Sequence, residues 1–476
     1  MSRAQWVLMP FAALVSACTI GPDYAGPEPI SVQLSEIAAT SDLVAGDAAL
    51  QADWWTRYND PVLDALMGDA AANNVDISQA VLRVREARAS RRLIDSARFP
   101  IIGGQASARR QEASTNAGGL GPPPGAPSVQ NLFDFGLNLF WELDLFGRLE
   151  RREEAADARI DASLFDRDAL TVAVLGETAL AYADLRGFQA QFAVGEDNIA
   201  LAQRIVDLTE DLVDQDLSSE FDLVRARADV TELEARQNSL IGAHRAAVAR
   251  LALLTGRQPS ELMADLMVPA PLPDAETAAP VAVPSELLRR RADIAAAERR
   301  LAAANEDVGA EIADLYPSFS LTGGYGLSAD QIGDLFETAS QSWNYGAVMN
   351  WPVFNRGVQD FEIDLAEIRF GQAGLAYRQT VLGALAEVEI ALADYVFAVQ
   401  ELEALKIAQA DRTRALELAE LRFSTGNDSL FPALEAARRL NGLNAEIAAR
   451  EVDVLKAQIT LYRALGGGWE SVAIEN

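Results

Sequence analysis

Apolar and polar residues alternate along the stretch from Asn131 to Phe146. The apolar positions are Phe133, Phe135, Leu137, Leu139, Trp141, Leu143 and Leu145, and the polar or small ones are Asp134, Gly136, Asn138, Glu142 and Asp144, with Phe140 as the exception. A period of two residues predicts a β-strand with one apolar face and one polar face. Such a strand fits a soluble sheet with one buried face or the wall of a transmembrane β-barrel.

Long helical segments surround this strand. One helical pattern starts at Asp60-Pro61, where a capping residue precedes a proline, and continues to about Arg98. A weak strand is expected over about 99–110, and a loop rich in Gly, Pro, Ser and Asn follows it. From Leu149 to Leu254 helix formers dominate, with one break at Asp214–Ser219. The helix before the break would be roughly 100 Å long at ~1.5 Å per residue, which exceeds one globular domain.

Beyond the break, small and apolar residues keep a heptad spacing. The positions are Leu223, Ala226, Val230, Leu233, Gln237, Leu240, His244, Ala247, Leu251 and Leu254. This spacing predicts the seam of an antiparallel coiled coil. His244 lies on the seam, and a single His without Cys or carboxylate partners makes no metal site, so we expect it to be structural.

The second half of the chain repeats the first. A helix expected from Ser285 to Leu315 is followed by strands at about 316–328 and 341–354, as strands at about 99–110 and 131–146 follow the first helix. From residue 177 to 256 the halves align without a gap at a constant offset of 210 residues, with Glu177 matching Glu387, Asp184 matching Asp394, Phe221 matching Phe431 and Gly256 matching Gly466. We therefore expect a two-fold internal repeat, with residues 59–256 and 285–476 joined by a Pro-rich linker at 257–284.

Composition and charge exclude several function classes. The chain has 70 Asp and Glu residues against 40 Lys and Arg, a net charge of -30, which argues against nucleic acid as a partner. With one His and one Cys, the chain can form neither a disulfide within itself nor a Cys/His zinc site, and a His-dependent triad is not expected.

The N-terminal residues have the layout of a secretory signal. Residues 1–17 contain Arg3, an apolar run and small residues before Cys18. The sequence Val15-Ser16-Ala17-Cys18 resembles a bacterial lipobox, which implies a covalent diacylglycerol and an N-acyl lipid on Cys18, and Thr19 in the next position implies sorting to the outer membrane. Residues 18–58 are then a lipidated N-terminal extended segment, anchored at a bilayer but not spanning it.

The number of predicted strands limits how they could meet lipid. Four strands cannot close a membrane barrel, because the smallest barrels need about eight. An open edge in hydrocarbon leaves backbone groups unpaired, so lipid-exposed strands would have to come from several chains. Three copies would supply twelve strands. A soluble four-stranded sheet would leave Trp141, Trp343 and Trp351 without cover.

Motifs along the whole chain resemble one family. They are Cys18-Thr19-Ile20-Gly21-Pro22-Asp23-Tyr24, Trp55, Asp60-Pro61 with Leu63, Arg291-Ala292-Asp293-Ile294 with Glu298, Tyr316-Pro317-Ser318, and Leu465-Gly466-Gly467-Gly468-Trp469. In this order they resemble the outer-membrane efflux lipoproteins, the NodT-type branch of the TolC/OprM family. The chain departs from the family pattern at Ala292, where the family usually has proline, and at Pro432.

The resemblance implies a mainly α fold with membrane β-structure: a homotrimer with a 12-stranded outer-membrane β-barrel continuous with a 12-helix periplasmic α-barrel. It implies a passive exit duct without catalysis or cofactor, in the outer membrane of a Gram-negative bacterium with most of its mass in the periplasm. The partners implied are a periplasmic membrane-fusion adaptor, an inner-membrane pump of the RND type and membrane lipid. The residues expected to face lipid are Phe133, Phe135, Leu137, Leu139, Trp141, Trp343, Tyr345 and Trp351.

The same resemblance places the functional ends at the helix breaks, which would be the periplasmic tips. It implies a carboxylate ring at Glu435, nine residues beyond Gly426, and a tip acid at Asp428, and such rings favour cations and can gate a pore. The tip and adaptor contacts expected are Asp214, Asp216, Ser218, Ser219, Phe423, Gly426 and Ser429. In the alternative interpretation, Asp428 caps the following helix and Glu435 lies on a solvated face.

Other functions stay open at the level of sequence. A channel for type I protein secretion or oligosaccharide secretion would share these features. A periplasmic coiled-coil adaptor lipoprotein would explain the helices and the lipidation, but not the aromatic alternation. A lipid-anchored carboxylate hydrolase would need paired acids in a compact pocket, which long heptad segments do not offer.

Overall fold

The computed structural model describes residues 19–27, 44–46, 53–112, 129–273, 279–281 and 291–467. Cys18 and the signal segment lie outside the described residues. The chain divides into two compact units. Unit 1 consists of Met1–Glu28, Arg83–Ser163 and Ala296–Tyr377, and unit 2 of Pro29–Leu82, Leu164–Ala295 and Arg378–Asn476. Each unit takes segments from both repeats, so neither repeat folds as a separate domain.

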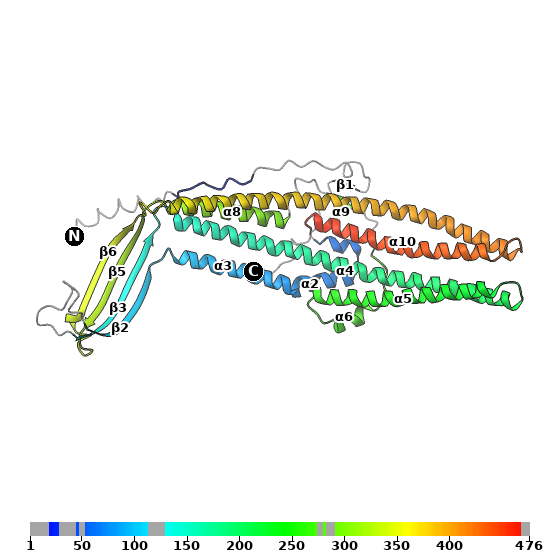
Figure 1. Ribbon diagram of the computed structural model, residues 1–476, viewed down its shortest axis with the longest axis horizontal. Helices are drawn as coiled ribbons and strands as arrows, with labels where there is room; N and C mark the ends of the chain where they lie inside the picture. The colour runs from blue at the N-terminus through cyan, green and yellow to red at the C-terminus, as the bar shows by residue number, and fades with distance from the viewer. Residues whose placement is uncertain are drawn as a thin grey trace. The chain divides into compact units, whose positions relative to one another are not determined.

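Unit 1 contains an antiparallel four-stranded sheet (Figure 1). Its strands, in spatial order, are β2 (Ile101–Glu112), β3 (Val129–Leu143), β5 (Ser318–Ala329) and β6 (Gln341–Asn350). Strands β2 and β5 begin immediately after Pro100 and Pro317, because proline has no N–H to donate to a ladder. Within the described residues β2 and β6 each pair with one strand only, so the sheet has two open edges.

The strand register sorts the side chains into two faces. Phe135 is paired with Ala106 and Leu327, and Asn138 is paired with Gly103 and Gly324. Directly paired residues lie on the same face of a sheet. One face carries Phe133, Phe135, Leu137, Leu139, Trp141, Leu321, Tyr325, Leu327, Trp343, Tyr345 and Met349, and the other Gln105, Ser107, Asp134, Asn138, Glu142, Ser320, Thr322, Ser328, Ser342 and Asn344. The predicted alternation is confirmed in β3, β5 and β6, whereas β2, expected only as a weak strand, has Ile101 on the polar face and Arg110 and Glu112 on the apolar face.

The strand ends differ from those expected. Strand β3 ends at Leu143, so Leu145 lies outside it, and Trp351 lies one residue beyond β6 rather than on a strand. Pairing stops there because Pro352 follows. The indole of Trp351 donates to the Leu315 carbonyl at 3.1 Å, as the indole of Trp141 donates to the Arg98 carbonyl at 2.8 Å. Each carbonyl lies two residues before the proline that precedes a strand, so the repeat extends to these contacts.

The helices of the two repeats correspond in length. They are α2 (Pro61–Asn73), α3 (Val75–Ser96), α4 (Arg148–Asp214), α5 (Glu220–Leu254), α6 (Pro259–Leu266), α8 (Ala292–Ala313), α9 (Val358–Ser424) and α10 (Phe431–Ala464). Helices α4 and α9 each have 67 residues, which confirms the predicted tunnel-length helices. In the described part of the chain no helix combines the length and apolarity needed to cross a membrane.

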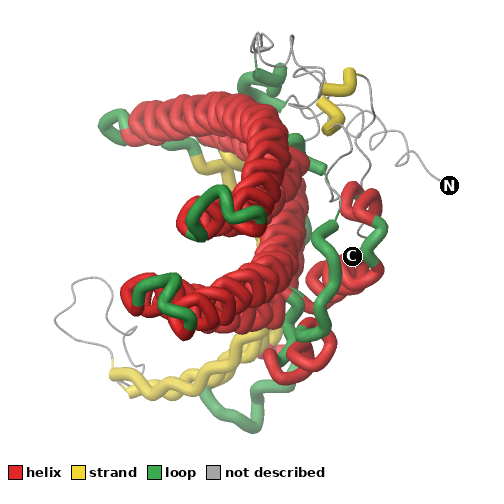
Figure 2. The backbone as a smooth tube through the Cα atoms, turned by 90° about the vertical axis from the view of Figure 1, so that its right-hand side faces the viewer, coloured by secondary structure: helices red, strands yellow, loops and turns green. Residues whose placement is uncertain are grey.

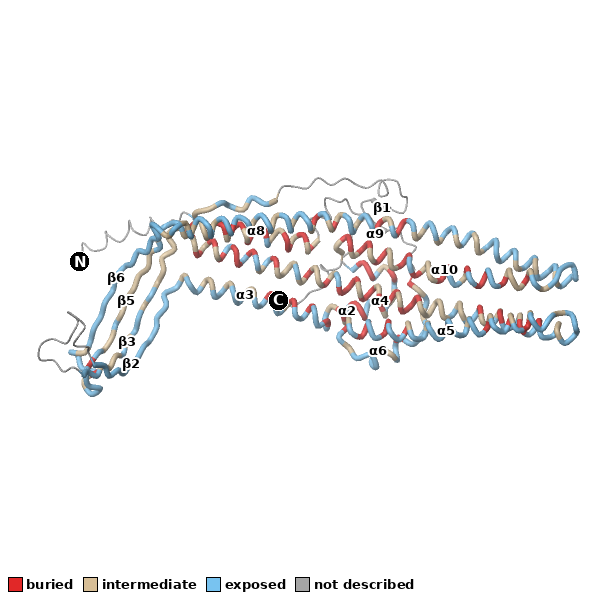
Figure 3. Tube along the Cα trace, in the orientation of Figure 1, coloured by how far each residue is buried: buried red, intermediate tan, exposed pale blue. Residues whose placement is uncertain are grey.

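Unit 2 holds the largest hydrophobic core, which the burial colours of Figure 3 show as red segments. A short 3-10 helix, η1 (Trp54–Tyr58), enters this core, and the Trp54 ring stacks on the Tyr462 ring with centroids 5.1 Å apart. Strand β1 (Val44–Gly46) pairs in parallel with β4 (Ala279–Val281). Seven of the expected seam residues of α5 are buried, which confirms the heptad: Leu223, Ala226, Val230, Gln237, His244, Ala247 and Leu251.

One prediction about secondary structure is wrong. The helix expected from Asp60 to Arg98 is broken at Asn74, whose backbone is extended and whose side chain accepts from the N–H groups of Asp76 and Ile77. Asn74 also donates to the Leu254 carbonyl at 2.9 Å, so a tertiary contact fixes the break. The Pro-rich linker contains α6, because Pro259 stands at the first turn of a helix, where proline is tolerated.

Two Gly→Ala changes in unit 2 should have opposite effects on stability. A Cβ at Gly187 would lie 2.5 Å from a methyl carbon of Val452, whereas a Cβ at Gly242 meets nothing within 4 Å. Gly187→Ala should destabilise the protein by about 1–3 kcal/mol through overpacking. Gly242→Ala should be neutral or stabilise it by up to ~1 kcal/mol, because Ala is the better helix former. Denaturant unfolding in detergent measures both, and equal shifts for the two variants would contradict close packing at Gly187.

Candidate functional site at the two helical tips

Two turns in unit 2 connect the long helices and have the same backbone geometry. The first tip, residues 215–219, joins α4 to α5, and the second tip, residues 425–430, joins α9 to α10 (Figure 2). In the first tip the N–H of Asp216 donates to the Val213 carbonyl at 2.9 Å, and in the second the N–H of Gly426 donates to the Phe423 carbonyl at 2.9 Å. Both helices therefore end in the same Schellman arrangement, at positions 210 residues apart.

The left-handed residue differs between the tips. Gly426 has φ 70° as expected from the motif, and Asp216, at the equivalent position, has φ 62°. Glycine adopts this conformation without steric cost, whereas a residue with a side chain is strained there.

Reciprocal substitutions should shift the local stability of the tips in opposite directions. Asp216→Gly should stabilise the first tip, because it removes the strain of a left-handed residue with a side chain. Gly426→Ala should destabilise the second tip by about 1 kcal/mol, because it introduces that strain. Hydrogen exchange at the amides of residues 212–217 and 422–427 measures each change. Slower hydrogen exchange in Gly426→Ala would contradict a left-handed backbone at Gly426.

The helix starts after the two turns are capped differently. The Ser219 hydroxyl accepts from the Asp222 N–H at 3.3 Å and donates to the Asp222 carboxylate at 2.6 Å, and this hydrogen bond lowers the pKa of Asp222. In the second tip Pro432 occupies the equivalent position, and α10 has no side-chain cap. The alternative in which Asp428 caps α10 is wrong: its carboxylate accepts from the adjacent Ser429 N–H at 3.0 Å and lies 3.3 Å from Arg422.

Glu435 is half-buried and ion-paired rather than on a solvated face. Its carboxylate lies 3.1 Å from a terminal nitrogen of Arg225 on α5, and 3.5 Å and 3.7 Å from Arg438 and Arg439 on its own helix. A second pair, Arg438 with Asp229 at 3.4 Å, also joins α10 to α5. The helices of the two tips are thus linked by ion pairs, with Arg225 and Glu435 at equivalent positions of the repeat.

Sequence reasoning missed Arg225, although a signal existed. The alignment of the repeats places Arg225 opposite Glu435, so equivalent positions carry opposite charges. A cavity of about 540 Å³ lies beside this pair between α4, α5 and α10, and its lining includes Gly195, Asn198, Arg225, Arg236, Gln237, Glu435 and Arg438.

The other expected tip residues lie at or near the turns. Asp214 ends α4 and is exposed, Ser219 caps the start of α5, and Ser429 lies in the second turn, whereas Phe423 is half-buried in the last turn of α9. Ser218 is half-buried beside Ser219. The structure adds an exposed apolar group that the sequence reasoning missed, namely Leu217 (71% exposed), Phe221 (72%) and Val224 (58%). The available signal was that these residues fall off the heptad seam.

His244 and the acidic residues form no metal centre in the described part of the chain. The His244 ring is buried, lies 3.1 Å from the Gln189 side-chain nitrogen, and has a pKa lowered by burial. Among the described residues no group of three or more His, Cys, Asp and Glu side chains could hold a metal ion.

Comparisons with known proteins agree with this fold. A family model described as "Outer membrane efflux protein" matches residues 66–257 and 283–467. "Cation efflux system protein CusC" of Escherichia coli O6:H1 is 30% identical over 474 residues, 97% of this chain and 99% of that protein. "Antibiotic efflux pump outer membrane protein ArpC" of Pseudomonas putida is 30% identical over 474 residues, 98% of this chain and 96% of that protein. The solved structure of the outer-membrane channel OprN has a TM-score of 0.87 at 33% identity, and the match covers 95% of this chain and 100% of that chain.

The two matched blocks correspond to the two repeats recognised in the sequence. The family consists of outer-membrane channels, so the hydrolase and adaptor alternatives are not retained. The chain belongs to the outer membrane efflux protein family, and it is an outer-membrane efflux channel rather than an enzyme.

Proposed function

We propose that three copies of the chain form a passive exit duct for small molecules, fed by an inner-membrane pump of the RND type through a periplasmic adaptor. The observation that carries this proposal is the open four-stranded sheet with one apolar and one polar face. Four strands cannot enclose a pore, and twelve can, if β2 of each copy pairs with β6 of the next. The polar face then lines the lumen.

The apolar face of the sheet has the exposure expected of a lipid-facing wall. Trp343 is 71% exposed and Tyr345 82% exposed in the single chain, although their rings stack on each other with centroids 5.7 Å apart. Exposed aromatic surface of this size normally marks contact with a membrane or another protein. Hydrocarbon covers these side chains in the proposed trimer, and Trp351, beyond the strand, lies at the interface.

The tips are the proposed contact with the adaptor. The exposed group Leu217, Phe221 and Val224 adds an apolar surface to the polar tip residues expected from the sequence, including Asp214, Asp216 and Ser219. An apolar patch with a polar rim is typical of a protein-binding surface. Leu421 (58% exposed) and Phe431 (51%) flank the second tip in the same way, so both tips supply docking surface in this proposal.

The gate is proposed at the ion-paired ends of α5 and α10. Opening the pore requires the helices of the two tips to separate, and the Arg225–Glu435 pair opposes this. Both expected gate carboxylates, Asp428 and Glu435, have arginine partners. A preference for cations therefore depends also on the acids in and beside the first tip, which are Asp211, Asp214, Asp216, Glu220 and Asp222.

Conductance of the purified protein in planar bilayers tests this function. We expect discrete single-channel currents with a preference for cations, and we expect Glu435→Gln combined with Asp428→Asn to reduce that preference. Absence of any conductance, with folded protein inserted, would contradict the duct. Conductance with unchanged selectivity in the double variant would contradict only the role of these carboxylates.

The proposed class of exported molecule is inferred from the names of two relatives. CusC is named for cation efflux and ArpC for antibiotic efflux, so small molecules are preferred here over secreted proteins or oligosaccharides. A deletion strain should become more susceptible to compounds of at least one of these classes. A strain that loses a secreted protein but keeps its resistance would favour the secretion alternative.

A further inference from the structure

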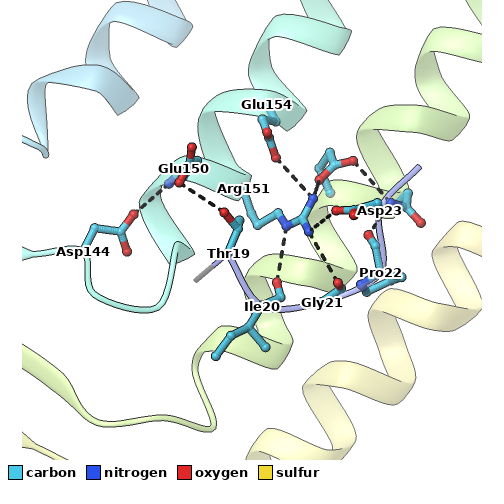
Figure 4. A network of polar contacts seen from close by, with 11 residues as sticks. Thr19, Ile20, Gly21, Pro22, Asp23, Asp144, Glu150, Arg151 and Glu154 are labelled. Atoms are coloured by element: carbon cyan, nitrogen blue, oxygen red, sulfur yellow. Dashed lines mark hydrogen bonds and ion pairs between the residues drawn. The ribbon is translucent and has the colours of Figure 1, made fainter. Parts of the chain in front are cut away.

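A buried arginine in unit 1 holds the first described residues of the chain (Figure 4). We call residues 19–24 the N-terminal strap. Arg151 of α4 is 4% exposed at its side chain, and its guanidinium donates to the carbonyls of Ile20 at 3.3 Å and Gly21 at 3.4 Å and to the carboxylate of Asp23 at 2.8 Å. The same group pairs with Glu306 of α8 at 2.5 Å and with Glu154 at 3.3 Å. Three of its five acceptors therefore belong to the strap.

The strap fits its site closely at three further points. The side-chain amide of Asn305 donates to the Pro22 carbonyl at 2.9 Å, and the Tyr24 hydroxyl donates to Glu298 at 3.0 Å. Burial raises the pKa of Tyr24, so it remains a neutral donor. Gly21 has φ 109°, and a Cβ there would lie 2.6 Å from the Cα of Gly309. Only glycine fits this position without displacement of the chain.

The start of the strap lies beside the ends of two strands. The N–H of Ile20 donates to the Phe146 carbonyl at 3.4 Å, and a Cβ on Gly147 would lie 2.9 Å from the Cα of Thr19. Phe146 follows the end of β3, and its ring stacks on that of Tyr316, just before β5, with centroids 5.0 Å apart. Aromatic residues at strand ends are typical of the interfacial girdles of a membrane barrel.

We propose that Arg151 is a positioning residue that clamps the strap, so that acyl chains on Cys18 enter a phospholipid leaflet beside these ends of β3 and β5. The inference rests on the proposed lipidation and on the proposed membrane sheet. Arginine suits this role because its planar group keeps its charge and offers five N–H donors in a fixed fork. A lipid tether alone attaches a chain to a bilayer. A docked strap also fixes where the lipid enters the bilayer, because it holds the residues that follow Cys18 in one conformation.

The mobility of a spin label placed directly after the strap tests whether Arg151 clamps it. Ala25 is exposed and adjoins Tyr24, and Cys18 is the only natural Cys. Ala25→Cys is labelled with a nitroxide in the full chain and reconstituted in phosphatidylethanolamine and phosphatidylglycerol vesicles. We expect a restricted spectrum with Arg151 present, a mostly mobile spectrum in Arg151→Met and an intermediate one in Arg151→Lys.

A second variant separates release of the strap from misfolding. Gly21→Ala displaces the strap by steric clash but leaves the buried Arg151–Glu306 pair in place, so it should mobilise the label in a folded trimer. The matched control is Arg159→Gln, because Arg159 on α4 also pairs with α8, through Asp307, but touches no strap residue. We expect the spectrum of this control to be unchanged.

Three results would overturn the clamp. They are an unchanged spectrum in Arg151→Met, an unchanged spectrum in Gly21→Ala, and equal mobilisation by Arg159→Gln. The labelling stoichiometry tests lipidation separately, since a thioether-linked Cys18 is not a thiol. One label per chain supports the lipid anchor, and two labels per chain contradict it while the mobility comparison still tests the clamp.

Discussion

Arg225→Glu should raise the open fraction of the channel by about two orders of magnitude. The change replaces an attraction between α5 and α10 by a repulsion between two carboxylates at the site of a 3.1 Å pair. A partly exposed ion pair contributes about 0.5 kcal/mol, and reversing its sign costs a similar amount again, which makes about 1 kcal/mol per copy. Summed over three copies, a change of roughly 3 kcal/mol corresponds to about a hundredfold shift in population. Open probability in planar bilayers measures it.

The control for this charge change is Arg227→Glu. Arg227 lies two residues further along α5 and pairs with Glu210 of α4 at 3.1 Å, within the first helix pair. Losing that pair does not unlink the two tips, so conductance should stay unchanged. Combining Arg225→Glu with Glu435→Arg should restore closure only partly, because the new guanidinium faces Arg438 and Arg439. Equal opening in both single variants would contradict a specific link.

Leu137→Arg should prevent stable assembly in the outer membrane, whereas Asn138→Arg should be tolerated. The two residues are neighbours near the middle of β3 but belong to opposite faces, since Leu137 is paired with Tyr325 and Asn138 with Gly324. Arginine on the lipid face near the midplane of a barrel costs about 2–4 kcal/mol per chain, and the trimer carries three copies. The yield of heat-resistant trimer in outer-membrane fractions measures the effect.

The tolerated variant gives a second measurement. Asn138→Arg adds three positive charges to the proposed lumen, so it should lower cation preference without lowering trimer yield. The two variants should differ because the register of β3 places neighbouring residues on opposite faces, and a shift of one residue would exchange the faces. Loss of trimer in Asn138→Arg together with normal assembly of Leu137→Arg would reverse the assignment of lipid and lumen.

Local periodicity explains which elements could be predicted. The alternation in β3 and the helix formers in α4 report geometry that repeats every two or 3.6 residues, so neighbouring residues carry the information. Asn74 shows the limit of this reasoning: it interrupts a helical pattern because its side chain caps α3 and bonds to the carbonyl of Leu254. A break held by a residue 180 positions away leaves no mark on the local pattern.

At the helical tips, too, some features could be predicted from sequence and others could not. Gly426 was predictable, because the left-handed turn selects for glycine. The repeat alignment places Arg225 opposite Glu435 but does not predict their ion pair, because a carboxylate on a helix face appears the same in sequence whether it is solvated or paired. The apolar residues Leu217 and Phe221 lie off the heptad seam, but this alone does not predict their exposure, since burial depends on which helices pack against them.

By itself the sequence determined the duplication, the tunnel-length helices, the two-faced strands and the resemblance to an outer-membrane channel, since these rest on spacing and order along the chain. Only the tertiary structure decided the partners of the charged groups. Arg151 appears in sequence as one of several arginines in a charged helix start, yet folding brings the carbonyls of residues 20 and 21 and a carboxylate from α8 around it. The physical reason is that the energy of a charge depends on burial and on neighbours in space, which the order of residues does not specify.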